Sequence, residues 1–337
     1  MPILGIIASG RRIAVDIAVA HATSPYVTAY PWSSAGFGTK YSDPATLPTG
    51  TGRAVAFSPS KAHIAVAHAT TPFVTAYPWS SSGFGSKIAD PATLPAGNAQ
   101  GVAFSPSGAD IAVSHSTTPF ISVYPWSSGF GTKYANPATL NTANGEFVTW
   151  SPSGADIAQG NFSATPFVHV WPWSAGFGTK YANPATLPAS AVIGVNWSPS
   201  GADIVTANFG SPPVTAYPWS AGFGTKYADP ATLPGGTQGI GVIFSPSGAD
   251  LAITSLASPY IQVYPWSAGW GTKYANPATL PSSGARWGEF SPSGTELAFG
   301  LGQSPFVTAY PWSAGFGTKY TDPATLPAGY GYDVDFS

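Results

Sequence analysis

Pro125-Trp126-Ser127-Ser128-Gly129-Phe130-Gly131 is one of seven near-copies of the same segment. The Pro-Trp dipeptide begins at residues 31, 78, 125, 172, 218, 265 and 311, in steps of 47, 47, 47, 46, 47 and 46 residues. A fixed period of this size indicates one supersecondary unit repeated along the chain. Because seven copies fill nearly all of the 337 residues, we expect a single domain over residues 1–337.

One repeat contains four short segments with strand character. Alternating large and small residues predict a first strand over 101–105, and Pro-Ser-Gly at 106–108 predicts a turn. Segments 110–115 and 120–124 predict the second and third strands, the third stopped by Pro125, and 130–134 predicts a weak fourth. Four antiparallel strands repeated radially predict an all-β fold, a seven-bladed β-propeller.

The two ends of the chain predict how the ring closes. Residues 332–337 match the first strand of a repeat, and residues 17–21 match the second. We therefore expect the last blade to combine about 17–47 with 330–337, so that N- and C-terminal strands share one blade and leave no open edges. Residues 1–16 are then an N-terminal extension.

Composition excludes several classes of function. Charged residues make up 8% of the chain and the net charge is -2, so no basic surface is available and nucleic-acid binding is not expected. No stretch approaches about 20 apolar residues, so membrane insertion is not expected. Cysteine is absent, which excludes disulfides, thiol catalysis and thiolate metal sites.

No motif in the chain predicts catalysis or a cofactor. His21, His68 and His115 occupy equivalent positions in three repeats, about 10 Å apart on neighbouring blades, which is too far to share one metal ion. The acidic residues that begin the second strands are explained by a hydrogen bond in the adjacent turn. They are Asp110, Asp156, Asp203, Asp250 and Glu296. We therefore predict no enzymatic activity, no metal and no cofactor.

Comparison of the seven copies separates a uniform face from a variable face. The Ser-Pro-Ser-Gly and Pro-Trp-Ser turns scarcely change, whereas the segments before the first strand and after the second strand differ in every copy. Binding residues concentrate on loops held by a rigid scaffold, so we predict a binding site on the variable face, at the mouth of the central channel. Its residues are Arg53, Gln100, Glu146, Ile193, Ile240, Arg286, Trp287 and Tyr332.

The repeated tryptophans allow a second hypothesis for binding. Seven equivalent indole rings could each stack on a sugar, which would give a multivalent carbohydrate-binding surface. These are Trp32, Trp79, Trp126, Trp173, Trp219, Trp266 and Trp312. Burial against the turn or between blades is the alternative that we favour, because large aromatic side chains usually bury most of their area.

The segment Phe104-Ser105-Pro106-Ser107-Gly108 resembles the turn of WD40-like propeller repeats, as found in bacteriophage and environmental bacterial genomes. The Pro-Trp dipeptide replaces the Trp-Asp of that family. The resemblance implies a non-enzymatic, virion-associated structural or attachment protein, made in the cytoplasm, whose variable face meets a protein partner or a surface glycan. The alternatives are a multivalent lectin at the cell surface or outside the cell, and an intracellular protein-interaction scaffold.

Overall fold

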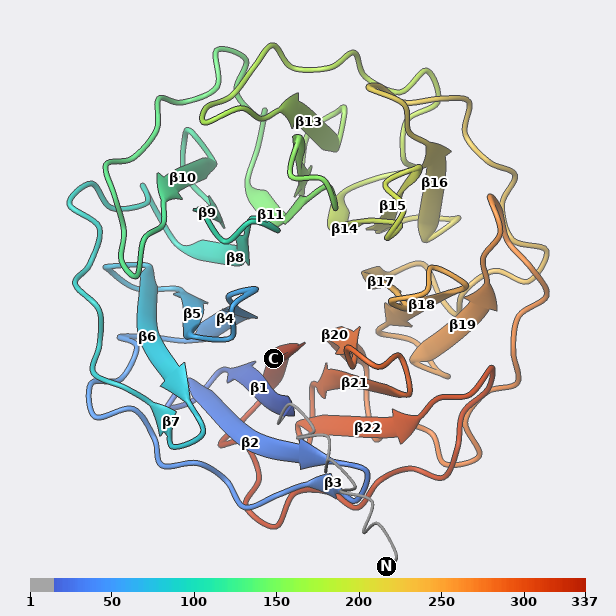
Figure 1. Ribbon diagram of the computed structural model, residues 1–337. Coiled ribbons are helices and arrows are strands. Elements are labelled where there is room, and N and C mark those ends of the chain that lie inside the picture. Colours follow the sequence, from blue (N-terminus) through green and yellow to red (C-terminus); the bar gives the residue numbers. More distant parts are fainter. Residues whose placement is uncertain (1–14) are drawn as a thin grey trace, which may run out of the picture.

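The computed structural model describes residues 15–337, which form a closed ring of seven blades around a central channel (Figure 1). From the innermost strand outward the blades are blade 1, with β4 (Gly52–Phe57), β5 (His63–His68), β6 (Val74–Ser80) and β7 (Gly83–Phe84); blade 2, with β8 (Ala99–Phe104), β9 (Asp110–His115) and β10 (Ile121–Pro125); blade 3, with β11 (Gly145–Trp150), β12 (Asp156–Asn161) and β13 (Val168–Pro172); blade 4, with β14 (Val192–Trp197), β15 (Asp203–Asn208) and β16 (Val214–Pro218); blade 5, with β17 (Gly239–Phe244), β18 (Asp250–Ser255) and β19 (Ile261–Pro265); blade 6, with β20 (Ala285–Phe290), β21 (Glu296–Leu301) and β22 (Val307–Pro311); and blade 7, with β23 (Gly331–Phe336), β1 (Val15–His21), β2 (Val27–Ser33) and β3 (Gly36–Phe37). The predicted seven-bladed all-β fold is confirmed.

Blade 7 closes the ring as predicted. Its innermost strand, β23, comes from the end of the chain and pairs antiparallel with β1, with Val334 opposite Val19. In Figure 1 the C-terminus lies at the inner edge of the blade that contains β1. Strand β1 already begins at Val15, and the rest of the predicted N-terminal extension lies outside the described residues.

The third and fourth strands differ from the prediction. Each third strand includes its proline, because the residue opposite needs no partner there: both backbone groups of Asp110 bond to Ser105, so Pro125 has no N–H to supply. The fourth strand is two residues long in blades 7 and 1. In the other five blades it is a single bridge, such as Trp126 with Phe130.

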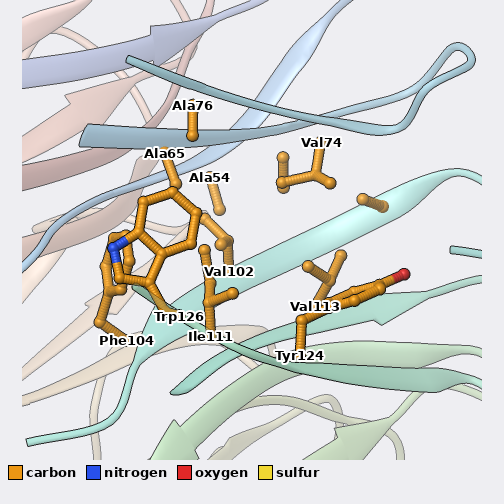
Figure 2. Packing of buried hydrophobic residues seen from close by; sticks show 12 residues of the cluster. Ala54, Ala65, Val74, Ala76, Val102, Phe104, Ile111, Val113, Tyr124 and Trp126 are labelled. Carbon is orange, nitrogen blue, oxygen red and sulfur yellow. The ribbon is translucent and has the colours of Figure 1, made fainter. Parts of the chain in front are cut away.

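The core lies between neighbouring blades. The middle strand of each blade is buried on both faces, so alternate residues pack against the blades on either side. Between blades 1 and 2, small Ala54 and Ala65 meet large Val102, Ile111 and Trp126 (Figure 2). Pairing small with large residues lets twisted sheets pack face to face without voids.

A hydrogen-bonded staple joins most neighbouring blades. In blade 3 the carboxylate of Asp156 accepts from Tyr181 Oη at 2.9 Å, in its own blade, and from Trp219 Nε1 of blade 4 at 3.3 Å. The same staple recurs on Asp16, Asp110, Asp203 and Asp250. The expected turn hydrogen bond is therefore an incomplete account of these residues: the backbone N–H bonds to the turn, while the carboxylate joins two blades.

Two of the seven junctions lack this staple. Between blades 1 and 2, His63 stands where the aspartate would be, and Ile88 replaces the tyrosine. Between blades 6 and 7, Glu296 turns its carboxylate to the hydroxyl groups of its own turn, and Trp32 Nε1 is buried without a hydrogen-bond partner. The sevenfold repeat is thus chemically broken at two places.

Candidate functional site

The predicted channel-mouth residues converge on one cavity. Each is the second residue of an innermost strand, at a β-bulge such as the one between Gly52 and Ala54. Together they line a cavity of about 100 Å³, which is formed by Arg53, Gln100, Glu146, Phe147, Ile193, Ile240, Arg286, Trp287 and Tyr332. Sequence comparison missed Phe147.

Two arginines from neighbouring parts of the ring lie on tyrosine rings at this mouth. The guanidinium of Arg53 is 4.6 Å from the ring centre of Tyr332, and that of Arg286 is 4.8 Å from the ring centre of Tyr330. The Nε atoms of both arginines are buried and have no hydrogen-bond partner. Within residues 15–337 neither guanidinium is in an ion pair. These are donors positioned for an anion that the protein itself does not supply.

Glu146 lies at the same mouth, on blade 3. Burial raises the pKa of its carboxyl to about 7, and the charge of Arg53 opposes part of that rise. A carboxyl with this pKa exchanges a proton near neutral pH, which is the property required of a general acid or base. Burial also lowers the pKa of Arg286, and the neighbouring charge of Arg53 adds to this effect.

An aromatic pair closes the channel beneath the mouth. Phe147 of blade 3 and Trp287 of blade 6 stack across it, with ring centres 3.6 Å apart and planes inclined by 10°. Glycine at the equivalent position of blade 4 leaves room for the indole, since a Cβ on Gly194 would lie 2.6 Å from Trp287 Cζ2. The mouth cavity therefore has a flat aromatic floor.

A second cavity, of about 260 Å³, lies below this floor and contains three carboxylates. Glu289 accepts from the backbone N–H of Phe336 at 2.9 Å, and Asp333 accepts from that of Val55 at 2.9 Å. Asp335 accepts from the N–H of Phe57. These bonds join innermost strands of blades 6, 7 and 1, so the carboxylates stabilise the place where the ring closes.

This carboxylate cluster predicts a specific pH dependence of stability. Burial raises the pKa of Glu289, and repulsion from Asp335 raises it further. Unfolded glutamate has a pKa near 4.3, so the folded protein binds the proton more tightly, and the cost of ionising Glu289 appears as pH rises above about 4. Glu289→Gln keeps an acceptor for Phe336 and removes that charge. We expect urea denaturation to show the variant more stable than wild type at pH 8, with the difference vanishing near pH 4.

The matched control is Glu296→Gln, in the turn of the same blade, where the glutamate bonds to three hydroxyl groups. It should leave the pH dependence of stability unchanged. Equal stability of Glu289→Gln and wild type from pH 4 to pH 8 would contradict the assignment. Comparing variant with wild type at each pH cancels the contribution of the buried histidines.

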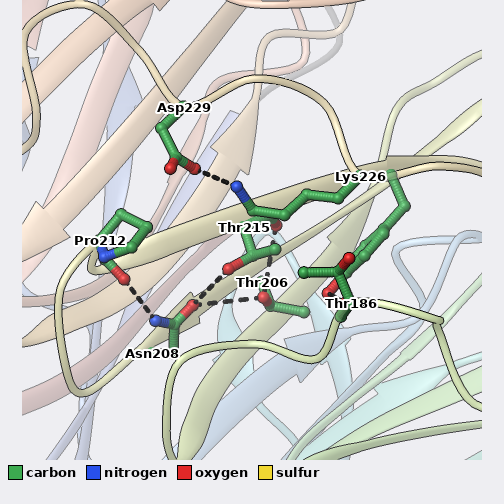
Figure 3. Close-up of polar contacts among 8 residues, drawn as sticks. Thr186, Thr206, Asn208, Pro212, Thr215, Lys226 and Asp229 are labelled. Carbon is green, nitrogen blue, oxygen red and sulfur yellow. Dashed lines mark hydrogen bonds and ion pairs between the residues drawn. The ribbon is translucent and has the colours of Figure 1, made fainter.

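The three equivalent histidines are structural. His21 bonds to Thr28 at 2.8 Å, His68 to Thr75 and His115 to Ser122, each through Nε2. Burial lowers the pKa of each to about 4. In blade 4 the same place holds Asn208, which donates to the Pro212 carbonyl and accepts from Thr206 and Thr215 (Figure 3). Among residues 15–337 no three His, Asp or Glu side chains are grouped so as to hold a metal ion.

The repeated tryptophans lie between blades and are not sugar platforms. Their side chains are only 4–8% exposed. Each also meets the edge of an aromatic ring at its own turn, as Trp219 does with Phe223 at 5.0 Å. No helix in the described part of the chain is long and apolar enough to cross a bilayer.

Comparison with known proteins gives similarity of fold only. No family model matches the chain, and no curated protein matches its sequence. The periplasmic gluconolactonase of Pseudomonas aeruginosa is 14% identical, with a TM-score of 0.73 over 96% of this chain and 99% of that one. A putative 6-phosphogluconolactonase from Bacteroides fragilis is 13% identical, with a TM-score of 0.73 over 98% and 99%. A putative 6-phosphogluconolactonase from Bacteroides uniformis is 14% identical, with a TM-score of 0.70 over 96% and 99%.

These similarities correct the functional prediction. The expected non-enzymatic phage-particle protein, with its lectin and scaffold alternatives, is wrong: the full-length structural matches carry the names of lactonases. The predicted location in a virion is wrong on the same ground, since one match is a periplasmic enzyme. The WD40-like and phage-derived origin finds no support among these structures, whereas the seven-bladed propeller does.

Proposed function

We propose that this protein is a hydrolase that opens a small, negatively charged lactone at the channel mouth. The observation that carries the proposal is the pair of arginines, each with a buried and unpartnered Nε, in one cavity with a carboxyl whose pKa is about 7. The lactonase names of structures that share the fold support the choice of reaction.

The reaction follows from these groups. Glu146, as the carboxylate, accepts a proton from water, and the oxygen of that water forms a bond to the lactone carbonyl carbon. Charge develops on the carbonyl oxygen, where a guanidinium donor stabilises it. The ring C–O bond then breaks, and the leaving oxygen takes the proton from Glu146 to give an open hydroxy acid. The second guanidinium binds the anionic substituent of the substrate, and the Phe147–Trp287 floor supports the ring.

The test is hydrolysis of lactones by the purified full-length chain. Proton release from a phosphorylated and from a neutral sugar lactone is followed with a pH indicator, and the spontaneous rate is subtracted. Replacing both arginines by methionine should lower kcat/KM for the phosphorylated lactone at least 100-fold, about 2.7 kcal/mol, because two charge-assisted contacts are lost. The neutral lactone should lose less.

Asp229→Asn is the control for this double variant, since its carboxylate pairs with Lys226 on the outer rim of blade 4. It should hydrolyse both lactones at the wild-type rate. Wild-type protein that gives only the spontaneous rate with every lactone would refute the proposal, as would an arginine double variant with unchanged selectivity.

A further inference from the structure

The junction between blades 1 and 2 differs from the other six in two coordinated positions. At five junctions the tryptophan Nε1 donates to an aspartate of the preceding blade. Here Trp126 meets His63, whose ring lies edge-on to the indole with ring centres 5.4 Å apart. The tyrosine that would share the aspartate is Ile88, so both the acceptor and its second donor are missing.

The double replacement opens a cavity. A space of about 240 Å³ lies at this junction, on the face that carries the uniform turns. Its lining includes Ser58, Ser60, His63, Ser107, Trp126 and Ser128. Figure 2 shows the Trp126 indole beside Phe104, and their ring centres are 5.2 Å apart.

Loss of the aspartate alone does not open such a space. At the junction of blades 6 and 7 the glutamate folds back onto its own turn, the tyrosine is retained as Tyr320, and Tyr320 packs on Trp32 with ring centres 5.1 Å apart. Trp32 Nε1 there is fully enclosed. The cavity therefore requires the exchange at Ile88 as well as at His63.

The lining favours an anion. It offers hydroxyl groups, an imidazole and the indole of Trp126, and it contains no carboxylate and no lysine. The indole N–H is the group that elsewhere in this ring binds a carboxylate. We propose that the cavity binds a small carboxylate ion, which takes the place of the missing aspartate side chain. This site is separate from the channel mouth and does not depend on the proposed hydrolase activity.

The test is a titration of the full-length chain with sodium acetate at constant ionic strength, with sodium chloride as reference. Binding is followed by the NMR signals of the indole N–H groups, and the Trp126 signal is assigned with Trp126→Phe. We expect that signal alone to shift and to saturate with acetate. His63→Asp supplies the carboxylate from the chain, so this variant should bind acetate at least tenfold more weakly and unfold at a higher temperature.

His63→Gln provides the matched control, because it leaves the cavity without a carboxylate and should retain acetate binding. An unsaturated or absent shift of the Trp126 signal would overturn the proposal. So would an equal shift with chloride, or unchanged acetate affinity in a folded His63→Asp variant. Lactone hydrolysis measured on the same variants should stay at the wild-type rate, which separates this site from the one at the channel mouth.

Discussion

Replacing Glu146 by glutamine is expected to lower kcat for lactone hydrolysis by about 10²–10⁴-fold, the usual contribution of a positioned general base. Glutamine keeps the size and polarity of the side chain but cannot accept the proton of the attacking water. Because the pKa of Glu146 is about 7, the wild-type rate should rise with pH through neutrality, as the carboxylate forms. The variant should lose that rise.

The control for Glu146→Gln is Ile240→Val, which changes the same cavity without removing a titratable group. It should retain the rise with pH and most of the rate. KM separates the two roles that Glu146 could have: loss of kcat at constant KM identifies a catalytic group, whereas a raised KM at constant kcat identifies one that only binds. A Glu146→Gln variant with the wild-type rate and pH profile would exclude the mechanism.

The period of the sequence was sufficient to predict the fold. A unit of 46–47 residues with four strand-like segments has few ways to bury its apolar faces, and a closed ring of seven is one that also removes open edges. The copies were equally useful for the mouth, because Arg53, Glu146 and Arg286 stand where no shared role in the blade constrains the residue. Their convergence on one cavity follows from ring symmetry.

The function could not be predicted in the same way. A fold of this kind hosts many activities, and the site decides among them. The resemblance of the Phe104–Gly108 turn to WD40-like repeats concerned the scaffold and carried no information about the mouth. The relevant signals were a carboxyl and two arginines in a nearly uncharged chain, and their burial and missing partners became visible only in three dimensions.

Two further features had signals in the sequence that went unused. Phe147 and Trp287 stand where four other copies have Ala54, Gly101, Gly194 and Gly241, and this exchange of small for large residues marks the aromatic floor. The aspartate staple joins residues 62 or 63 positions apart in different blades, so no comparison within one repeat could reveal it. The joint change of the aspartate to His63 and of the tyrosine to Ile88 was its trace.

The staple gives the largest expected effect on stability. Asp156→Ala would leave Tyr181 Oη and Trp219 Nε1 without their acceptor at a buried junction. Each unsatisfied buried donor costs about 1–3 kcal/mol, so the free energy of unfolding should fall by about 2–6 kcal/mol. Urea denaturation followed by tryptophan fluorescence measures this loss. Asp156→Asn, which retains one acceptor oxygen, should show a smaller one.

Glu296→Ala is the matched control for Asp156→Ala, because it changes the same position of the blade at a junction that has no staple. Glu296 bonds to Ser291, Ser293 and Thr295 in an open turn, and Trp32 already lacks a partner, so the loss should stay below about 1 kcal/mol. Equal losses for the two alanine variants would show that the aspartates act within their own turns. A large difference would instead locate the cohesion of the ring in the carboxylate shared between blades, because only Asp156 contacts the next tryptophan.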